Sequence, residues 1–219
     1  MYPVQIRFLH DGYDDNKVNK QQKFKRNISI LEKHIQQYPD DVLSHSFLGR
    51  EHLILGNPDA AIRHLVRARE LLTASKNSIA LAEVERNLVW ALDSKGDVAQ
   101  AESLAFGLTQ RFPDYVDGWY MYGMYQLRKV VSLQSAIQHI AKSLELSSKG
   151  KYATDPAIGE YKAMLHLADE HRLSGIWIEA RKLYAEVLRR APEYAPAKNV
   201  LAQMDKQVLE IAKEIRGNL

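Results

Sequence analysis

The chain has 219 residues, of which 46% are hydrophobic and 26% charged, so it can form one or two globular domains or an elongated repeat array. The formal net charge of +3 is too small to indicate nucleic acid as a partner, and the absence of cysteine excludes disulfides and thiolate metal sites. No uncharged run approaches the roughly 20 residues that span a bilayer and no signal-peptide pattern is present, so we expect a cytoplasmic location and no membrane span.

The first 19 residues have a different pattern from the rest of the chain. Val4, Ile6 and Phe8 alternate with polar residues, and this period of two is typical of a half-buried strand. The remainder has helical periodicity. We therefore expect a non-helical arm over residues 1–19 and a helical domain over residues 20–219.

Helical units follow the arm. The first predicted helix covers residues 20–37, and three proline landmarks then separate the units: Tyr38-Pro39-Asp40, Phe112-Pro113-Asp114 and Ala191-Pro192-Glu193. Proline cannot continue a helix, so each landmark is a break. Each gap between landmarks is about twice the 34 to 40 residues of a helix-turn-helix repeat, so each contains two units. A last helix over residues 195–216 is expected to cap the array.

Small residues recur at matching places in the four units. They fall in the first helix (Gly49, Gly123, Ala168), in the second helix (Ala61, Ala101, Ala136, Ala180) and at the end of the first helix (Gly56, Gly96, Gly175). Small residues let two antiparallel helices approach closely, and a glycine after a helix favours a left-handed cap. The pattern resembles the tetratricopeptide repeat. That resemblance implies an all-α helix-turn-helix solenoid, a right-handed superhelix of about ten helices.

The units depart from the repeat in three places. The third unit has Val130-Val131 where a turn glycine is expected. Extra residues lie near residues 73–78 and around Gly150, and we interpret both insertions as longer first helices. The second of these helices should begin at Asp155-Pro156, where an N-cap residue precedes proline at the first helical position.

The beginning of the chain resembles a second known region. Bacterial family 2 glycosyltransferases with C-terminal tetratricopeptide repeats often end their catalytic domain in a similar strand, followed by a similar helix. The matching residues here are Ile6, His10, Gly12, Tyr13, Arg26, Asn27, Leu31 and Glu32. The resemblance implies that residues 1–19 are the last strand of a catalytic domain, and that His10 completes a divalent metal site beside a nucleotide-sugar in an intact parent enzyme. The alternative is an arm of a free-standing repeat protein.

The sequence contains no catalytic motif of its own. Glycine-rich phosphate loops, HExxH and EF-hand patterns are missing, and so is the Asp-x-Asp of the glycosyltransferases. His45 and His52 lie two helical turns apart, too far to share a metal, while His166 and His171 diverge around a helix. We expect His45, His52 and His171 to be packed, hydrogen-bonded core residues. This chain is therefore predicted to be non-enzymatic, with no cofactor.

The first helices of successive units are expected to share a concave binding face. Helical phase gives this predicted groove the following residues: Arg50, Arg86, Asn87, Trp90, Tyr120, Met124, Arg128, Lys162, His166 and Arg172. Only Asn87 and Lys162 resemble the carboxylate clamp of chaperone-binding tetratricopeptide domains, while Ser46, Asp117 and Met121 break it. A chaperone adaptor is therefore disfavoured.

These observations predict a non-catalytic protein-interaction scaffold. Its partner would be a protein or peptide, or a second copy in a homodimer. The first hypothesis makes it the acceptor-recognition or dimerisation region of a bacterial family 2 glycosyltransferase. The alternative is a free-standing tetratricopeptide adaptor. An enzyme fragment that binds sugar or nucleotide is disfavoured because the residues it needs are missing.

Overall fold

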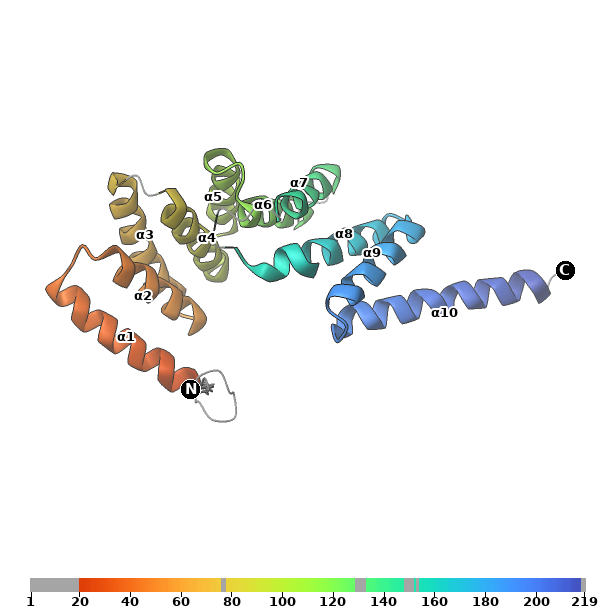
Figure 1. The fold of residues 1–219 in the computed structure, drawn as a ribbon, viewed down its shortest axis with the longest axis horizontal. Coiled ribbons are helices and arrows are strands. Elements are labelled where there is room, and N and C mark those ends of the chain that lie inside the picture. Colours follow the sequence, from red (N-terminus) through yellow and green to blue (C-terminus); the bar gives the residue numbers. More distant parts are fainter. Residues whose placement is uncertain (1–19, 76–77, 129–132, 148–151, 153, 218–219) are drawn as a thin grey trace, which may run out of the picture.

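The computed structural model describes residues 20–75, 78–128, 133–147, 152 and 154–217 (Figure 1). The predicted arm over residues 1–19, with His10, and the Val130-Val131 pair lie outside these ranges. Within them the structure contains ten α-helices and no strand, which confirms the all-α prediction. None of the helices in this part of the chain is long and apolar enough to cross a membrane.

The helices follow one another as a linear array (Figure 1). They are α1 (Lys20–Gln37), α2 (Val42–Ile54), α3 (Pro58–Ser75), α4 (Ser78–Lys95), α5 (Val98–Arg111), α6 (Val116–Arg128), α7 (Leu133–Leu146), α8 (Ala163–Leu173), α9 (Trp177–Arg190) and α10 (Ala195–Gly217). A π-helical segment, Ile158–Lys162, precedes α8. Each helix packs chiefly on its neighbours in sequence, as expected for a solenoid. The pairs α2–α3, α4–α5, α6–α7 and α8–α9 form four units, flanked by α1 and α10.

Glycines and aspartates determine where the helices end and begin. Gly56, Gly96 and Gly175 have φ angles of 74°, 91° and 76°, so each forms the predicted left-handed end of a first helix. A Cβ atom on any of the three would meet nothing within 4 Å, so the backbone angle alone requires glycine there. The Asp155 carboxylate accepts a hydrogen bond of 3.0 Å from the Ala157 N–H, as the predicted N-cap requires.

The two helices of a unit approach closely at small residues. A Cβ atom on Gly49 would lie 2.6 Å from Leu65 Cδ2, and one on Gly123 would lie 2.6 Å from Ile140 Cγ1. The facing Ala61 is fully buried. These contacts confirm that small residues bring the helices of the first and third units together.

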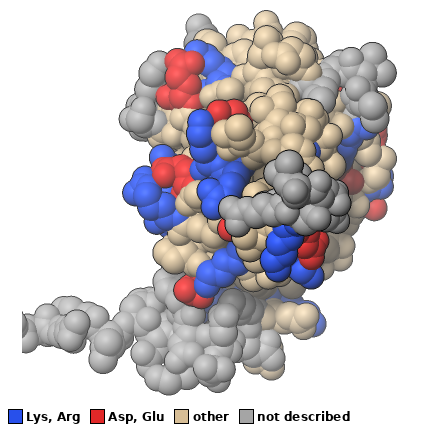
Figure 2. All heavy atoms as spheres, turned by 90° about the vertical axis from the view of Figure 1, so that its right-hand side faces the viewer, with Lys and Arg blue, Asp and Glu red and all other residues tan. Residues whose placement is uncertain are grey.

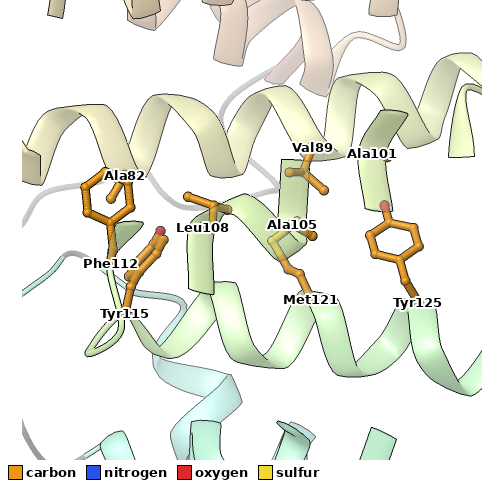
Figure 3. Close-up of a cluster of buried hydrophobic side chains, with 9 residues drawn as sticks. All are labelled: Ala82, Val89, Ala101, Ala105, Leu108, Phe112, Tyr115, Met121 and Tyr125. Carbon is orange, nitrogen blue, oxygen red and sulfur yellow. The ribbon is translucent and has the colours of Figure 1, made fainter. Parts of the chain in front are cut away.

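The core runs through the array as successive clusters of buried side chains. One cluster joins α4, α5 and α6, and Figure 3 shows its members: Ala82, Val89, Ala101, Ala105, Leu108, Phe112, Tyr115, Met121 and Tyr125. Phe112 and Tyr115 lie with Ala82 at one end of the cluster, Tyr125 and Ala101 lie at the other, and the aliphatic side chains and Met121 lie between them (Figure 3). Further clusters lie between α3 and α4, around α6 to α8, and around α8 to α10.

One predicted insertion is placed differently in the structure. Residues near 73–78 were expected to lengthen only the first helix of the second unit. Instead, α3 continues to Ser75, and the Thr73 hydroxyl donates a 2.8 Å hydrogen bond to the Arg69 carbonyl within that helix. Since α4 begins at Ser78, the insertion extends the helices on both sides.

The terminal helix α10 is only partly the predicted cap. Met204 is buried, but Val208 and Ile211, which follow it at helical spacing, are 58% and 56% exposed. The reason is length. Helix α10 has 23 residues, whereas α9, on which it packs, has 14. The C-terminal part of α10 therefore extends past the end of α9 (Figure 1).

The close approach at Gly49 gives a stability prediction. Gly49→Ala should lower the free energy of unfolding by about 1–3 kcal/mol, because the new methyl group would overlap the Leu65 side chain. Gly107→Ala in α5 is the control. Its Cβ would approach only the end of the Arg111 side chain, at 3.0 Å, so the loss should be smaller than at Gly49 and is offset in part by better helix propensity. Urea denaturation measures the free energy of unfolding of both variants. An unchanged value for Gly49→Ala would contradict the close contact between Gly49 and Leu65.

Candidate functional site

All of the predicted groove residues lie on the first helices of the units or on the segment leading into α8. We call the surface formed by α2, α4, α6 and α8 the first-helix face. Arg50 is in α2, Arg86, Asn87 and Trp90 are in α4, Tyr120, Met124 and Arg128 are in α6, Lys162 is in the π-helical segment, and His166 and Arg172 are in α8.

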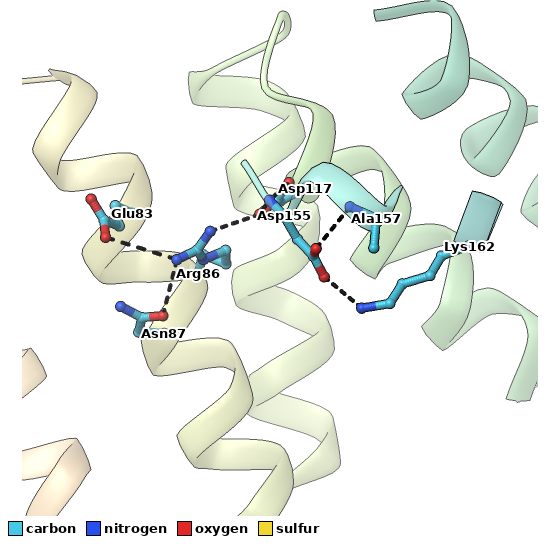
Figure 4. A network of polar contacts seen from close by, with 7 residues as sticks. All are labelled: Glu83, Arg86, Asn87, Asp117, Asp155, Ala157 and Lys162. Carbon is cyan, nitrogen blue, oxygen red and sulfur yellow. Dashed lines mark hydrogen bonds and ion pairs between the residues drawn. The ribbon is translucent and has the colours of Figure 1, made fainter. Parts of the chain in front are cut away.

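An ion pair links α4 to α6 on this face. Arg86 Nη1 donates to Asp117 Oδ2 at 2.9 Å, and the side chains are 12% and 0% exposed (Figure 4). A second Arg86 nitrogen donates to the Asn87 amide oxygen at 3.4 Å, and Glu83 lies 3.9 Å away. Asn87 itself is 4% exposed, so it supports Arg86 rather than facing a ligand.

The same carboxylate continues the network to α8. Both oxygens of Asp117 accept the Asp155 N–H, each at 3.3 Å (Figure 4). The Asp155 side chain in turn accepts a 2.5 Å hydrogen bond from Lys162 Nζ. Burial raises the pKa of Asp117, and the Arg86 ion pair opposes that shift. The network therefore holds three first helices together, and the sequence reasoning had treated Asp117 only as a residue that breaks the carboxylate clamp.

The other predicted arginines also have partners within the chain. Arg128 donates to both oxygens of Asp93, at 2.7 and 3.2 Å. The Arg50 guanidinium lies 5.0 Å from the Phe47 ring centroid, and Arg172 Nε donates to the Tyr184 hydroxyl at 3.3 Å. The guanidinium groups expected to be open for a ligand are thus already oriented by internal contacts.

Charges elsewhere on the surface are paired in the same way. Figure 2 shows basic and acidic side chains beside one another on the face that it displays, separated by uncharged areas. Among the pairs near α9 and α10, Arg181 bonds Asp205 at 2.8 Å, and Glu186 accepts from Arg189 and Arg190 at 2.7 Å.

Aromatic groups occupy the part of the first-helix face between these ion pairs. Trp90 is 37% exposed, and the Arg86 guanidinium lies 5.2 Å from the centroid of its ring. Tyr120 packs beside His166 with ring centroids 5.9 Å apart, and burial raises the pKa of Tyr120 to about 12. Met124 is half-buried and packs on the core. The predicted aromatic residues therefore lie on successive first helices, with Trp90 against Arg86 on α4 and Tyr120 against His166 between α6 and α8.

A further aromatic pair was not predicted from the sequence. Tyr161 and Tyr194 lie beside one another, with ring centroids 5.0 Å apart, and join the segment before α8 to the start of α10. Tyr161 follows the insertion around Gly150, and Tyr194 directly follows the third proline landmark, so no single repeat position relates the two residues.

Three histidines cluster between α2 and α3. His45 Nδ1 lies 3.1 Å from His64 Nδ1, its Nε2 lies 2.9 Å from the Pro39 carbonyl oxygen, and the His52 ring stacks on His64 at 5.7 Å. Because a carbonyl can only accept, His45 carries its proton on Nε2, and the neutral His64 donates to His45 Nδ1. Protonating both rings would place two N–H groups opposite each other.

The prediction of packed histidines is confirmed in part. His45 is buried and hydrogen-bonded, whereas the Nδ1 atoms of His52 and His171 are buried with no hydrogen-bond partner in the part of the chain that the structure describes. Within the described ranges, no three His, Cys, Asp or Glu residues form a group that could hold a metal ion. His10, the predicted metal ligand of the parent enzyme, lies outside those ranges.

No protein-family model and no curated protein matches the sequence. Solved structures do match. A crystal structure of MamA is 17% identical, with a TM-score of 0.59 over 87% of this chain and 99% of that chain. A second MamA structure is 18% identical, with a TM-score of 0.57 over 85% and 92%. TTC0263, described as a thermophilic TPR protein in Thermus thermophilus, is 19% identical, with a TM-score of 0.54 over 84% and 91%. The fold is a tetratricopeptide-type solenoid.

In a tetratricopeptide-type fold, the first helices of the repeats form a surface on which a ligand can be expected. Solenoids of this kind present an extended concave surface built from one helix of each repeat. In this chain that surface has internally paired arginines and a series of partly exposed aromatic rings. Whether the predicted groove binds a ligand stays a prediction.

The histidine cluster predicts that the tetratricopeptide solenoid loses stability in acid. Desolvation lowers the pKa of His64 from 6.5 to about 4, with smaller effects of His45, His52 and Arg63. Between these two values the unfolded chain binds a proton that the folded chain does not, so stability is full above pH 6.5 and decreases toward pH 4. Since the ring is partly exposed, we expect His64 to account for roughly 1 kcal/mol.

Denaturation of wild type and His64→Gln at pH 8 and at pH 4.5 measures this effect. The variant should lose less stability between the two pH values than the wild type. Comparing the two losses removes any constant cost of the substitution. Equal losses would show that His64 does not titrate as the cluster requires.

Proposed function

We propose that this chain is a non-catalytic scaffold that binds a protein or peptide on the first-helix face. The observation that supports it most is Trp90, a large ring left 37% exposed in the middle of the array and held against Arg86. Tryptophan is among the side chains that most often dominate binding at interfaces. The Tyr120–His166 pair extends the apolar surface toward α8.

The ligand that fits best is an extended segment with apolar and acidic residues. Trp90 offers a face for an apolar anchor, and the side chains of Arg50 and Arg128 remain 44% and 54% exposed. Their N–H groups beyond those used internally can bond carboxylates of the segment. Because Asp93 and Glu51 already offset part of their charge, a bare polyanion fits this face less well.

The more specific proposal is that the chain belongs to a cytoplasmic, bacterial family 2 glycosyltransferase, where it recognises the acceptor or dimerises the enzyme. Its support is the sequence resemblance of residues 6–32. In that parent, His10 would complete a divalent metal site beside a nucleotide-sugar. The reading frame upstream of Met1 tests this. A domain with Asp-x-Asp there supports the glycosyltransferase, and its absence supports a free-standing adaptor.

Homodimerisation has its own supporting observation. Val208 and Ile211 of α10, with Trp177 of α9, line an open cavity of 460 Å³ beside the last unit. These side chains are about half exposed, and Leu209 next to them is 62% exposed. An apolar surface on an extending terminal helix suits a second copy of the same helix.

Titration with fluorescent peptides that alternate apolar and acidic residues tests the main proposal. Trp90→Ala should weaken binding by about 2 kcal/mol or more if the indole is the anchor. Trp177→Ala is the matched control, because Trp177 is 46% exposed but lies on α9. It should leave peptide binding unchanged.

A loss of binding at Trp177 instead of Trp90 would contradict the proposed position of the partner site. If Trp177→Ala reduces binding and Trp90→Ala does not, the partner site is at α9 and α10, and the first-helix face is not the binding surface. Sedimentation velocity on the same two variants reports dimerisation separately.

A further inference from the structure

A groove on the second helices has a chemistry that the proposed function does not use. It lies between α3 and α5, above α4, and has a volume of 380 Å³. Apolar side chains line most of it, including Ile62 of α3, Leu88 and Leu92 of α4, and Leu104 of α5. Val66 of α3 also lines it and is 37% exposed, so this apolar surface is open to solvent.

Two arginines lie at one end of this groove. Arg69 comes from the C-terminal part of α3, Arg111 is the last residue of α5, and each side chain is 44% exposed. Both bind Glu85 in the first half of the antiparallel α4: Arg69 Nε lies 3.2 Å from one carboxylate oxygen, and Arg111 Nη2 lies 2.5 Å from the other. Glu85 is 2% exposed, so the carboxylate lies beneath the two guanidinium groups.

This triad leaves an unbalanced positive charge at the groove. Two guanidinium groups share one buried carboxylate, and the only charged residues among those lining the groove are the two arginines. Each guanidinium has five N–H donors, and Glu85 accepts one from each at the distances above. Because Glu85 holds both side chains in place, a second carboxylate could bond them with little further loss of side-chain freedom.

We propose that this groove binds a segment of a partner protein in which an apolar side chain lies next to a carboxylate. The apolar side chain lies over Leu88, Leu92 and Leu104, and the carboxylate bonds Arg69 and Arg111. Charge complementarity selects an acidic group, and the open position between two surface helices suits a protein segment better than a fully enclosed small molecule. The two arginines come from second helices, and helical phase puts the α4 residues Leu88 and Leu92 on a different side of that helix from Arg86 and Trp90, so the site does not use the first-helix face.

The test uses the full chain with labelled Ile, Leu and Val methyl groups, titrated by NMR with the peptide acetyl-Leu-Leu-Glu-amide. Methyl signals of Ile62, Val66 and the groove leucines should shift. The counterpart peptide with glutamine in place of glutamate should bind about tenfold more weakly, because it cannot form charge-assisted bonds with the arginines. This comparison changes the ligand and leaves the buried Glu85 triad intact.

A protein variant provides the second arm. Val66→Glu places a carboxylate in the groove three residues before Arg69, where it competes with the ligand, so binding should fall at least about tenfold. Val66 is exposed, so the fold should tolerate the change. Ile178→Glu, at a 72% exposed residue near the start of α9 that lines neither this groove nor the cavity beside α10, is the control and should bind as the wild type does.

Three results would overturn the inference. They are no methyl shifts at millimolar peptide, equal affinity for the glutamate and glutamine peptides, or undiminished binding to Val66→Glu. Shifts confined to residues around Trp90 and Tyr120 would likewise overturn it while supporting the first-helix face. Conversely, Trp90→Ala should not change binding at this groove, so the two proposals fail or succeed separately.

Discussion

The ion pair between Arg86 and Asp117 is the contact on which the arrangement of the first helices depends. Asp117 has no exposed surface, and its carboxylate is held by a guanidinium from α4 and by a backbone N–H from the segment before α8. Removing either residue leaves the other as an unpaired buried charge, which lowers the free energy of unfolding by about 3–5 kcal/mol. Adjacent repeats of a solenoid otherwise contact one another mainly through apolar packing. This pair joins α4 to α6, and the Asp155 N–H extends the polar contact to the segment before α8, in the next unit.

Pairs of arginine with a buried carboxylate occur in two places in the array and differ in how much positive charge they leave unpaired. On the first helices, one arginine meets one aspartate, and the 12% exposure of Arg86 leaves little of its charge for a ligand. On the second helices, two arginines share Glu85 and each remains 44% exposed. The ratio of guanidinium to carboxylate thus distinguishes an ion pair that is balanced within the fold from a triad with excess positive charge, which we propose also binds a carboxylate. On the first-helix face, the proposed binding surface consists mainly of aromatic side chains.

Much of the fold could be predicted because its signals are local. Gly56, Gly96 and Gly175 mark positive φ angles, and the proline landmarks mark breaks, whatever the tertiary structure. The close approach at Gly49 follows from periodicity, since repeats place equivalent residues at equivalent contacts. Those signals were sufficient for the number of helices and for most of their boundaries.

The candidate site was harder to predict because its contacts join residues that no short pattern relates. Arg86 and Asp117 are 31 positions apart, and helical phase assigned Arg86 to the first-helix face without revealing its partner. Asn87 was assigned to the groove, but its side chain is buried behind Arg86. Helical spacing does not distinguish the exposed Val208 and Ile211 from the buried Met204, and the difference follows from the unequal lengths of α9 and α10.

A double-mutant cycle on Arg86 and Asp117 tests the central claim most directly. Unfolding free energies are measured by urea denaturation for Arg86→Gln, Asp117→Asn, the double variant and the wild type. If the pair organises the first helices, each single variant loses about 3–5 kcal/mol and the double variant loses less than the sum, with a coupling of about 1–3 kcal/mol. Losses that add to within about 0.5 kcal/mol would show that the two residues act independently and would contradict the account.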